Sequence, residues 1–126
     1  RVTLRCPDSG EEVNTLALVD TGADLTVGLR SAFPHSCKQT VKSENLRTAT
    51  GSSMTKSAST YHTEAEVIYG HHSLGTPEIV TLAELSSPLI IGIDFLRLIQ
   101  AVISLDEAAM WVLCRLLSQT LFGLCF

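Results

Sequence analysis

Asp20, Thr21 and Gly22 stand together at the end of an apolar stretch, residues 16–19. We expect that stretch to be a buried strand, which would fix the position of the side chains that follow it. Gly22 permits the backbone to approach a ligand closely, and apolar neighbours disfavour the charged form of a carboxyl group. The segment therefore predicts that Asp20 acts as an acid or a base.

A second segment, residues 87–96, makes this interpretation more specific. The Asp-Thr-Gly tripeptide alone is weak evidence, because average residue usage places it by chance in roughly a few per cent of chains this long. The later segment contains a continuous apolar run, residues 88–93, which is typical of a strand buried on both faces. Asp94 then follows as the expected N-cap of a short helix that ends at Ile99. This capping role accounts for Asp94 without making it a second catalytic carboxylate.

The two segments together resemble those of retropepsins, in particular the proteases of gypsy-type LTR retrotransposons. The resemblance covers residues 10–113 and rests on the Asp-Thr-Gly-Ala motif and on Leu-Ile-Ile-Gly-Ile-Asp-Phe-Leu at residues 89–96. It implies an all-β, retropepsin-like closed barrel with one short helix after the second motif. It also implies a two-fold homodimer with one active site at its interface, and a flap from each subunit over a peptide substrate.

The resemblance also assigns roles to the residues of the first motif. Asp20 matches the catalytic aspartate, and Thr21 matches the residue whose hydroxyl binds the partner's backbone across the dimer axis. Gly22 is expected to contact the substrate. Ala23 belongs to the same loop, and Asp24 matches a residue that contacts the peptide backbone in several members of the family.

Two further expectations follow from the resemblance. The flap is expected within residues 46–61, a Thr- and Ser-rich stretch typical of an exposed hairpin, with Thr50, Gly51 and Ser52 at the substrate. The second motif has isoleucine after its glycine, where retroviral enzymes have arginine. The usual partner of Asp24 is therefore missing, and Arg97 is the candidate to replace it.

The number of motifs predicts the assembly. Peptide hydrolysis by this chemistry needs two carboxylates that share one proton across a bound water, and the sequence holds one such motif. A closed two-fold interface brings the same residue of both subunits face to face, so one Asp20 per chain is enough. We therefore expect a homodimeric aspartic endopeptidase that acts on a peptide or polyprotein without a metal or cofactor. Its activity should be highest in mildly acidic to neutral solution.

Turn-forming residues recur at intervals typical of a chain built from short strands. We expect one protease domain over residues 1–113, followed by an apolar tail, residues 114–126. The expected hairpins pair residues 2–6 with 13–19, 63–69 with 78–82, and 101–105 with 109–113. Leucines at helical spacing in and before the tail allow an extra C-terminal helix on the body or on a partner.

The composition argues against several other classes of protein. A chain of 126 residues has the length of one ordinary domain, and 45% hydrophobic residues are enough to form a core. The net charge of −4 and the scattered Lys and Arg argue against direct nucleic-acid binding. The apolar tail is too short and too polar to span a membrane. We expect a cytoplasmic protein, including the interior of virus-like particles.

The cysteines and histidines are not spaced as a zinc site requires. We expect Cys6, Cys37, Cys114 and Cys125 to be reduced thiols without a disulfide framework. The four histidines are expected at the surface or in turns.

Two alternatives to a mobile-element protease stay open. A domesticated element can keep the retropepsin fold as a catalytically silent dimerisation or peptide-binding module. The retropepsin-like domain of ubiquitin-shuttle proteins also carries this motif, but the sequence has no ubiquitin-like segment. The intact Asp-Thr-Gly favours catalysis, and no serine or cysteine lies in a recognisable nucleophile elbow.

Overall fold

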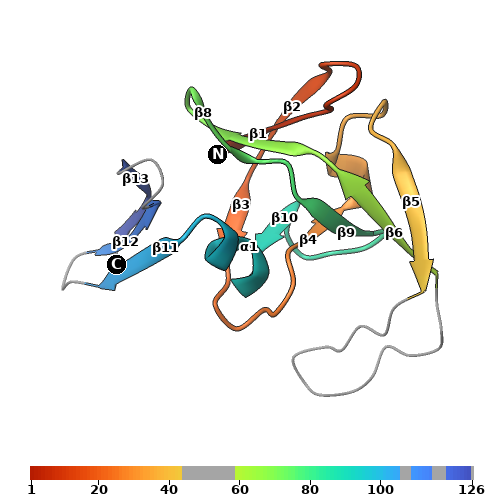
Figure 1. Ribbon diagram of the computed structural model, residues 1–126. Helices are drawn as coiled ribbons and strands as arrows, with labels where there is room; N and C mark the ends of the chain where they lie inside the picture. Colours follow the sequence, from red (N-terminus) through yellow and green to blue (C-terminus); the bar gives the residue numbers. More distant parts are fainter. Residues whose placement is uncertain (44–58, 106–108, 115–118, 126) are drawn as a thin grey trace.

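The chain folds into β-strands with one α-helix, as Figure 1 shows for the computed structural model, which describes residues 1–43, 59–105, 109–114 and 119–125. The strand pairings form sheets of four, six and three strands. The predicted all-β class is confirmed. None of the pairings among the described residues joins the ends of one sheet into the closed barrel that was expected.

The four-stranded sheet contains the opening hairpin that the sequence predicts. Its order is β2-β1-β7-β8. The strands are β1 (Val2–Arg5), β2 (Glu12–Thr15), β7 (Glu66–Tyr69) and β8 (His72–Gly75). β1 and β2 are antiparallel, and Gly10 lies in their connection with a φ of 74°, a conformation that glycine adopts without strain.

The six-stranded sheet carries both motifs. Its order is β3-β10-β4-β9-β6-β5. The strands are β3 (Ala17–Val19), β4 (Val27–Leu29), β5 (Gln39–Ser43), β6 (Ser59–Glu64), β9 (Glu78–Leu82) and β10 (Leu89–Ile91), and a 3-10 turn (Arg30–Ala32) follows β4. β10 lies between β3 and β4, and Leu89 and Ile91 are 0% and 1% exposed. The buried strand predicted from the apolar run is therefore confirmed.

The predicted pairing of residues 63–69 with 78–82 is only half right. The chain leaves the six-stranded sheet after β6 and enters the four-stranded sheet at β7, so β6 pairs with β9 while β7 pairs with β8. Ala65 stands at this change of sheet and is 0% exposed. A small side chain fits such a buried corner, and periodicity along the sequence gives no sign of it.

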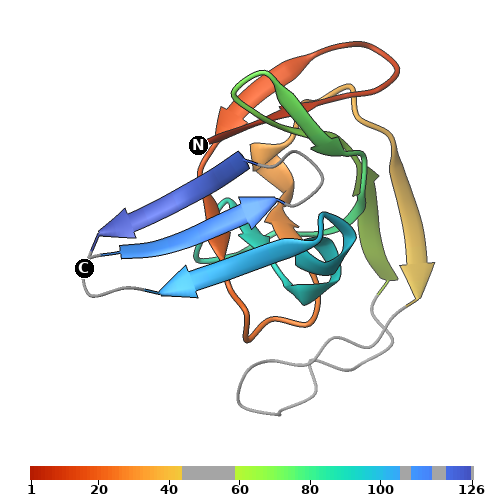
Figure 2. The same ribbon diagram turned by 60° about the vertical axis from the view of Figure 1, so that its left-hand side comes forward.

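The C-terminal part begins with the helix α1 (Ile93–Leu98) and continues as an antiparallel sheet. The strands are β11 (Ala101–Leu105), β12 (Ala109–Cys114) and β13 (Gln119–Cys125). The predicted hairpin of β11 and β12 is confirmed. Figures 1 and 2 show this sheet beside the main body, joined to it through α1.

The extra C-terminal helix that the leucine spacing allowed is wrong over residues 119–125, which form β13 on β12. Thr120, Phe122 and Gly123 all have poor helix propensity, and Gly123 costs a helix about 1 kcal/mol relative to alanine. Pairing with β12 instead satisfies the backbone groups of one side of the segment. The helix present in the described residues, α1, is too short to cross a bilayer.

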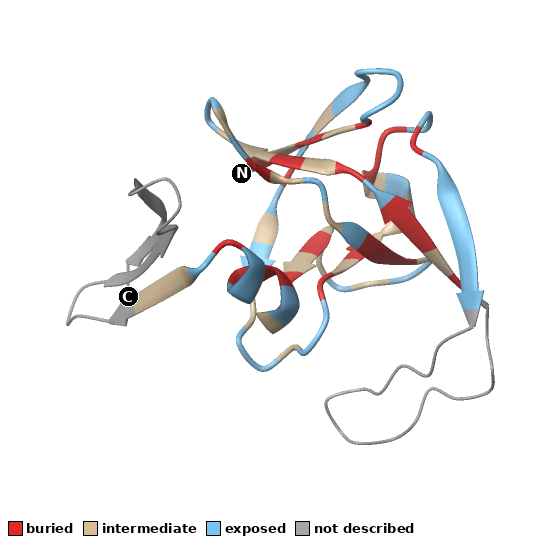
Figure 3. Cartoon of the chain, viewed as in Figure 1, coloured by how far each residue is buried: buried red, intermediate tan, exposed pale blue. Residues whose placement is uncertain are grey.

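The hydrophobic core joins the two larger sheets and α1. Figure 3 shows the buried positions concentrated on the strands of the main body. Leu4 from β1, Val67 from β7 and Ile79 from β9 are fully buried, and Phe95 packs into the same cluster from α1. Burial of Phe95 and its neighbour Leu96 fixes α1 against the strands, and hence the second motif against the first.

Candidate active site

The loop that contains Asp20 begins where β3 ends beside β10. The two strands are parallel, with Val19 opposite Ile91. The Asp20 amide extends this pairing by donating a hydrogen bond to the carbonyl oxygen of Ile91 at 2.9 Å. Because β10 is buried between two neighbouring strands, this bond sets the position of the first residue of the loop.

The Asp20 carboxylate is held by its own loop. The Gly22 amide donates to Oδ1 of Asp20 at 2.9 Å, and the Ala23 amide donates to the Asp20 carbonyl oxygen at 3.1 Å. A Cβ atom on Gly22 would lie 3.2 Å from the same Oδ1, so glycine allows this tight turn. Asp20 is half-buried, and its other carboxylate oxygen has no hydrogen-bond partner within the part of the chain that the structure describes.

The neighbouring residues of the motif lie at the surface of the chain. Thr21, Gly22 and Asp24 are exposed, while Ala23 is half-buried. The Thr21 hydroxyl makes no hydrogen bond to any described residue of its own subunit. The loop therefore has an exposed threonine beside a half-buried aspartate, while its backbone is hydrogen-bonded to Ile91.

The second motif supplies the backbone bonds that hold this loop. The Ile93 amide donates to the Ala23 carbonyl oxygen at 2.8 Å, and the Asp94 amide donates to the Asp24 carbonyl oxygen at 3.3 Å. These bonds come from the start of α1, where amide groups lack partners within the helix. The two motifs are thus joined directly by backbone hydrogen bonds.

The prediction that Asp94 is the helix N-cap is wrong. The cap is Gly92, with extended dihedral angles of φ −95° and ψ −176°, and Asp94 lies within the first turn. Asp94 Oδ1 accepts from the Phe95 amide at 2.7 Å, from the Thr26 amide at 2.9 Å and from the Thr26 hydroxyl at 2.7 Å. The carboxylate therefore connects the helix to the end of the Asp20 loop, 68 residues earlier.

Thr26 completes this connection, and the sequence reasoning missed it. Its hydroxyl accepts a hydrogen bond from the Gly92 amide at 3.0 Å while it donates to Asp94, and the residue is 4% exposed. The available signal was a hydroxyl residue between the apolar Leu25 and Val27, where a buried polar group requires a partner. Asp94 and Thr26 hold the loop that positions Asp20.

Replacement of Gly92 by alanine should destabilise this junction. An added Cβ would lie 2.5 Å from the Leu25 carbonyl oxygen and 2.8 Å from that of Ala23, so the backbone of the Asp20 loop must move. We expect a loss of about 3 kcal/mol in the free energy of unfolding. Urea denaturation of the purified variant measures it.

Gly70→Ala is the matched control for this change. Gly70 has a φ of 60° but no atom within 4 Å of an added Cβ, so its replacement costs only the backbone strain, about 1 kcal/mol. Equal losses for the two variants would contradict the close contact between Gly92 and the loop.

The other predicted substrate contacts are only partly placed. Thr50, Gly51 and Ser52 lie outside the described residues, although the flanking strands β5 and β6 pair antiparallel up to Ser43 opposite Ser59. Within one subunit no ion pair joins Arg97 to Asp24, so the expected replacement of the missing arginine is not found there.

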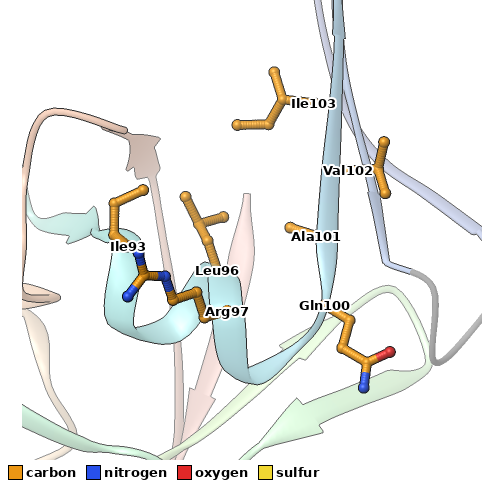
Figure 4. A pocket seen from close by; sticks show the side chains of 7 residues that line it. All are labelled: Ile93, Leu96, Arg97, Gln100, Ala101, Val102 and Ile103. Carbon is orange, nitrogen blue, oxygen red and sulfur yellow. The ribbon is translucent and has the colours of Figure 1, made fainter.

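Arg97 instead lines a groove between α1 and β11. Figure 4 shows the side chains around this groove, which has a volume of about 500 Å³. The lining residues are Ile93, Leu96, Arg97, Gln100, Ala101, Val102 and Ile103. The groove is mainly aliphatic, with Arg97 and Gln100 as its polar members.

One histidine departs from the expected surface position. His62 is 6% exposed, with Nδ1 3.5 Å from Oε1 of Glu78 and Nε2 3.3 Å from the Thr60 hydroxyl. Lys42 lies 2.7 Å from the same Glu78 oxygen, and its hydrogen bond lowers the pKa of the Glu78 carboxyl. Across the described residues, no three His, Cys, Asp or Glu side chains are grouped as a metal site.

In this all-β body, an Asp-Thr-Gly loop follows one of two parallel strands. A Gly-Ile-Asp segment at the start of α1 holds that loop through hydrogen bonds. This combination is typical of retropepsin-like domains. The family model described as retroviral aspartyl protease matches residues 2–104. The chain therefore belongs to the retroviral aspartyl protease family. A search of curated proteins found no match.

Proposed function

We propose that the protein is an aspartic endopeptidase whose active unit is a homodimer with one Asp20 from each copy. The observation that carries this proposal is the Asp20 carboxylate, which is bound on one oxygen by the Gly22 amide in a loop held by the second motif. Membership of the retroviral aspartyl protease family supports the same chemistry.

In the proposed reaction, two Asp20 carboxyl groups share one proton across a water molecule. The ionised group takes a proton from the water as its oxygen attacks the scissile carbonyl carbon. The protonated group donates a hydrogen bond to the carbonyl oxygen, and proton transfer to the nitrogen then releases the amine. Two carboxylates that are close enough to share a proton repel each other when both are ionised. We therefore expect the highest activity in mildly acidic to neutral solution.

Exposed leucines near the catalytic loop support the dimer. Leu18 on β3 and Leu25 stand on either side of the motif in the sequence. Their large apolar side chains are 47% and 41% exposed. Leu16, just before β3, and Leu98, at the end of α1, are 56% and 58% exposed. Apolar surface of this kind is a mark of an interaction site, and we propose that a second copy and the substrate cover it.

Unpaired strand edges support the same assembly. β3 is an edge strand of the six-stranded sheet, and β11 and β13 are the edges of the three-stranded sheet. Edge strands carry free backbone donors and acceptors that can pair with another chain. We propose that the sheet of β11, β12 and β13 contributes to the interface, where the Thr21 hydroxyl binds the partner's backbone.

The substrate and origin are proposed from the form of the second motif. Gly92-Ile93-Asp94 is the version of the motif in retrotransposon relatives, which favours processing of the parent polyprotein of such an element. The setting we propose is the cytoplasm, including virus-like particles. Ala23 and Asp24, with Thr50, Gly51 and Ser52 of the flap, are the proposed substrate contacts beside the catalytic residues.

Sedimentation combined with a peptide-library cleavage assay tests assembly and chemistry together. We expect a concentration-dependent monomer–dimer equilibrium, with cleavage that follows the dimer fraction and is inhibited by pepstatin. A dimer that cleaves no peptide would instead indicate the silent binding module. Full turnover by a strictly monomeric preparation would contradict the shared active site.

A further inference from the structure

Two buried cysteines from distant parts of the sequence meet in the core. Cys6 follows β1 and is 1% exposed, and Cys37 precedes β5 and is 7% exposed. Both are free thiols that belong to the same hydrophobic cluster, where Cys37 lowers the pKa of Cys6 and Cys6 raises the pKa of Cys37. The two cysteine side chains therefore lie close to each other in the folded chain.

Polar contacts hold the two cysteine-bearing segments against each other. The Ser9 and Ser36 hydroxyl oxygens are 2.5 Å apart, and Nζ of Lys38 lies 3.1 Å from Oδ2 of Asp8. A third contact joins the same segments, because the His35 amide donates to Oε1 of Glu11 at 3.2 Å. These contacts hold the segment that follows Cys6 beside the segment on either side of Cys37.

The two thiols differ in acidity, with Cys6 the more acidic. Such a difference favours one of them as the attacking thiolate in thiol–disulfide exchange. The pKa of Cys6 is lowered to about 7, mainly by a hydrogen bond with the Ser9 side chain and next by one with the Ser9 backbone. Burial is the main cause that raises the pKa of Cys37 to about 12. At neutral pH a large fraction of Cys6 is thiolate, which is the attacking species, while Cys37 stays protonated.

We propose that Cys6 and Cys37 form a redox-modification site, in which a low-molecular-weight disulfide such as oxidised glutathione converts the two thiols into an intramolecular disulfide. The Cys6 thiolate attacks one sulfur of the reagent, whose sulfur–sulfur bond breaks and releases one thiolate. Cys37 then loses its proton and attacks the Cys6 sulfur, which releases the second thiolate. The protein loses two electrons, the reagent gains them, and the two thiol protons pass to the released thiolates.

Access of the reagent and the consequence of the bond follow from the position of the pair. Cys6 begins the exposed turn of residues 7–10, which is closed by the hydrogen bond from the Gly10 amide to the Cys6 carbonyl oxygen, and we expect local opening of this turn to expose the sulfur. The disulfide would close a loop of residues 6–37, which contains the whole Asp20 loop. We expect the midpoint of thermal unfolding to rise by roughly 10 °C on oxidation.

The experiment is oxidation of the folded full chain with oxidised glutathione, followed by alkylation, protease digestion without reduction, and mass spectrometry. The expected product has lost two hydrogen atoms and contains a peptide pair joined through Cys6 and Cys37. Its thermal midpoint should return to the starting value after reduction. Absence of this crosslink in folded protein, or crosslinks that run through Cys114 or Cys125, would overturn the proposal.

Variants separate the pair from the other cysteines. The double replacement of Cys114 and Cys125 by serine should keep both the crosslink and the rise in thermal midpoint. Cys6→Ser should lose both, and Cys37→Ser should stop at a mixed disulfide between Cys6 and glutathione. The peptide map of unmutated protein decides the matter even where a serine variant folds poorly.

Discussion

Replacement of Asp20 by asparagine is expected to lower kcat/KM for peptide cleavage by about 10⁴-fold. Asparagine keeps an oxygen that can accept from the Gly22 amide, so the loop bond at 2.9 Å can persist while the acid–base function is lost. Cleavage of a fluorogenic peptide by the purified protein measures the effect. The fold and the sedimentation behaviour of the variant should match those of the unmutated protein.

Asp8→Asn is the matched control for that variant. Asp8 is also an aspartate in a turn, but it is exposed, and within the described residues its carboxylate forms a surface ion pair with Lys38, an interaction worth little. Its replacement should leave cleavage unchanged. Retained cleavage in Asp20→Asn, or equal losses in the two variants, would contradict the catalytic assignment of Asp20.

Replacement of Asp94 by alanine is expected to cost about 3 kcal/mol of folding free energy. The change removes the common acceptor of three hydrogen bonds, two of them from the buried Thr26. It leaves the amide and hydroxyl of Thr26 without this acceptor in the interior. Because Thr26 ends the loop that carries Asp20, cleavage should fall as well. Urea denaturation gives the stability change.

Asp94→Asn distinguishes the hydrogen bonds from the charge. The asparagine oxygen can still accept from Thr26, so the expected loss is only about 1 kcal/mol. If Asp94→Asn and Asp94→Ala cost equal folding free energy, the negative charge of Asp94 dominates over its hydrogen bonds. A negligible effect of Asp94→Ala would show that the connection from Thr26 to α1 does not hold the loop.

The strands, the turn and the helix around the candidate site follow from local sequence and were predicted correctly. The apolar run at residues 88–93 gave the buried strand β10, because a strand with neighbours on both sides needs apolar residues at consecutive positions. The Asp-Thr-Gly motif gave the loop after β3, where Gly22 allows a turn that brings an amide onto the Asp20 carboxylate. The short helix after the second motif was expected in the same way.

Features that depend on contacts between distant residues were missed or wrong. The Thr26–Asp94 connection joins positions 68 residues apart, and the pairing of Cys6 with Cys37 likewise depends on tertiary packing. The burial of His62 reflects neighbours on adjacent strands, including Glu78 on β9. Leucine spacing near the C-terminus suggested a helix, but pairing of β13 with β12 prevails over that local pattern.

Cleavage measured in mixtures of unmutated and Asp20→Asn protein tests the shared active site most directly. Total protein is kept constant, well above the dissociation constant of the dimer, and the subunits are allowed to exchange before peptide is added. If both Asp20 carboxyl groups are needed, activity should fall as the square of the unmutated fraction, because mixed dimers are inactive. Activity directly proportional to the unmutated fraction would mean that each chain hydrolyses peptide by itself, and would contradict the account.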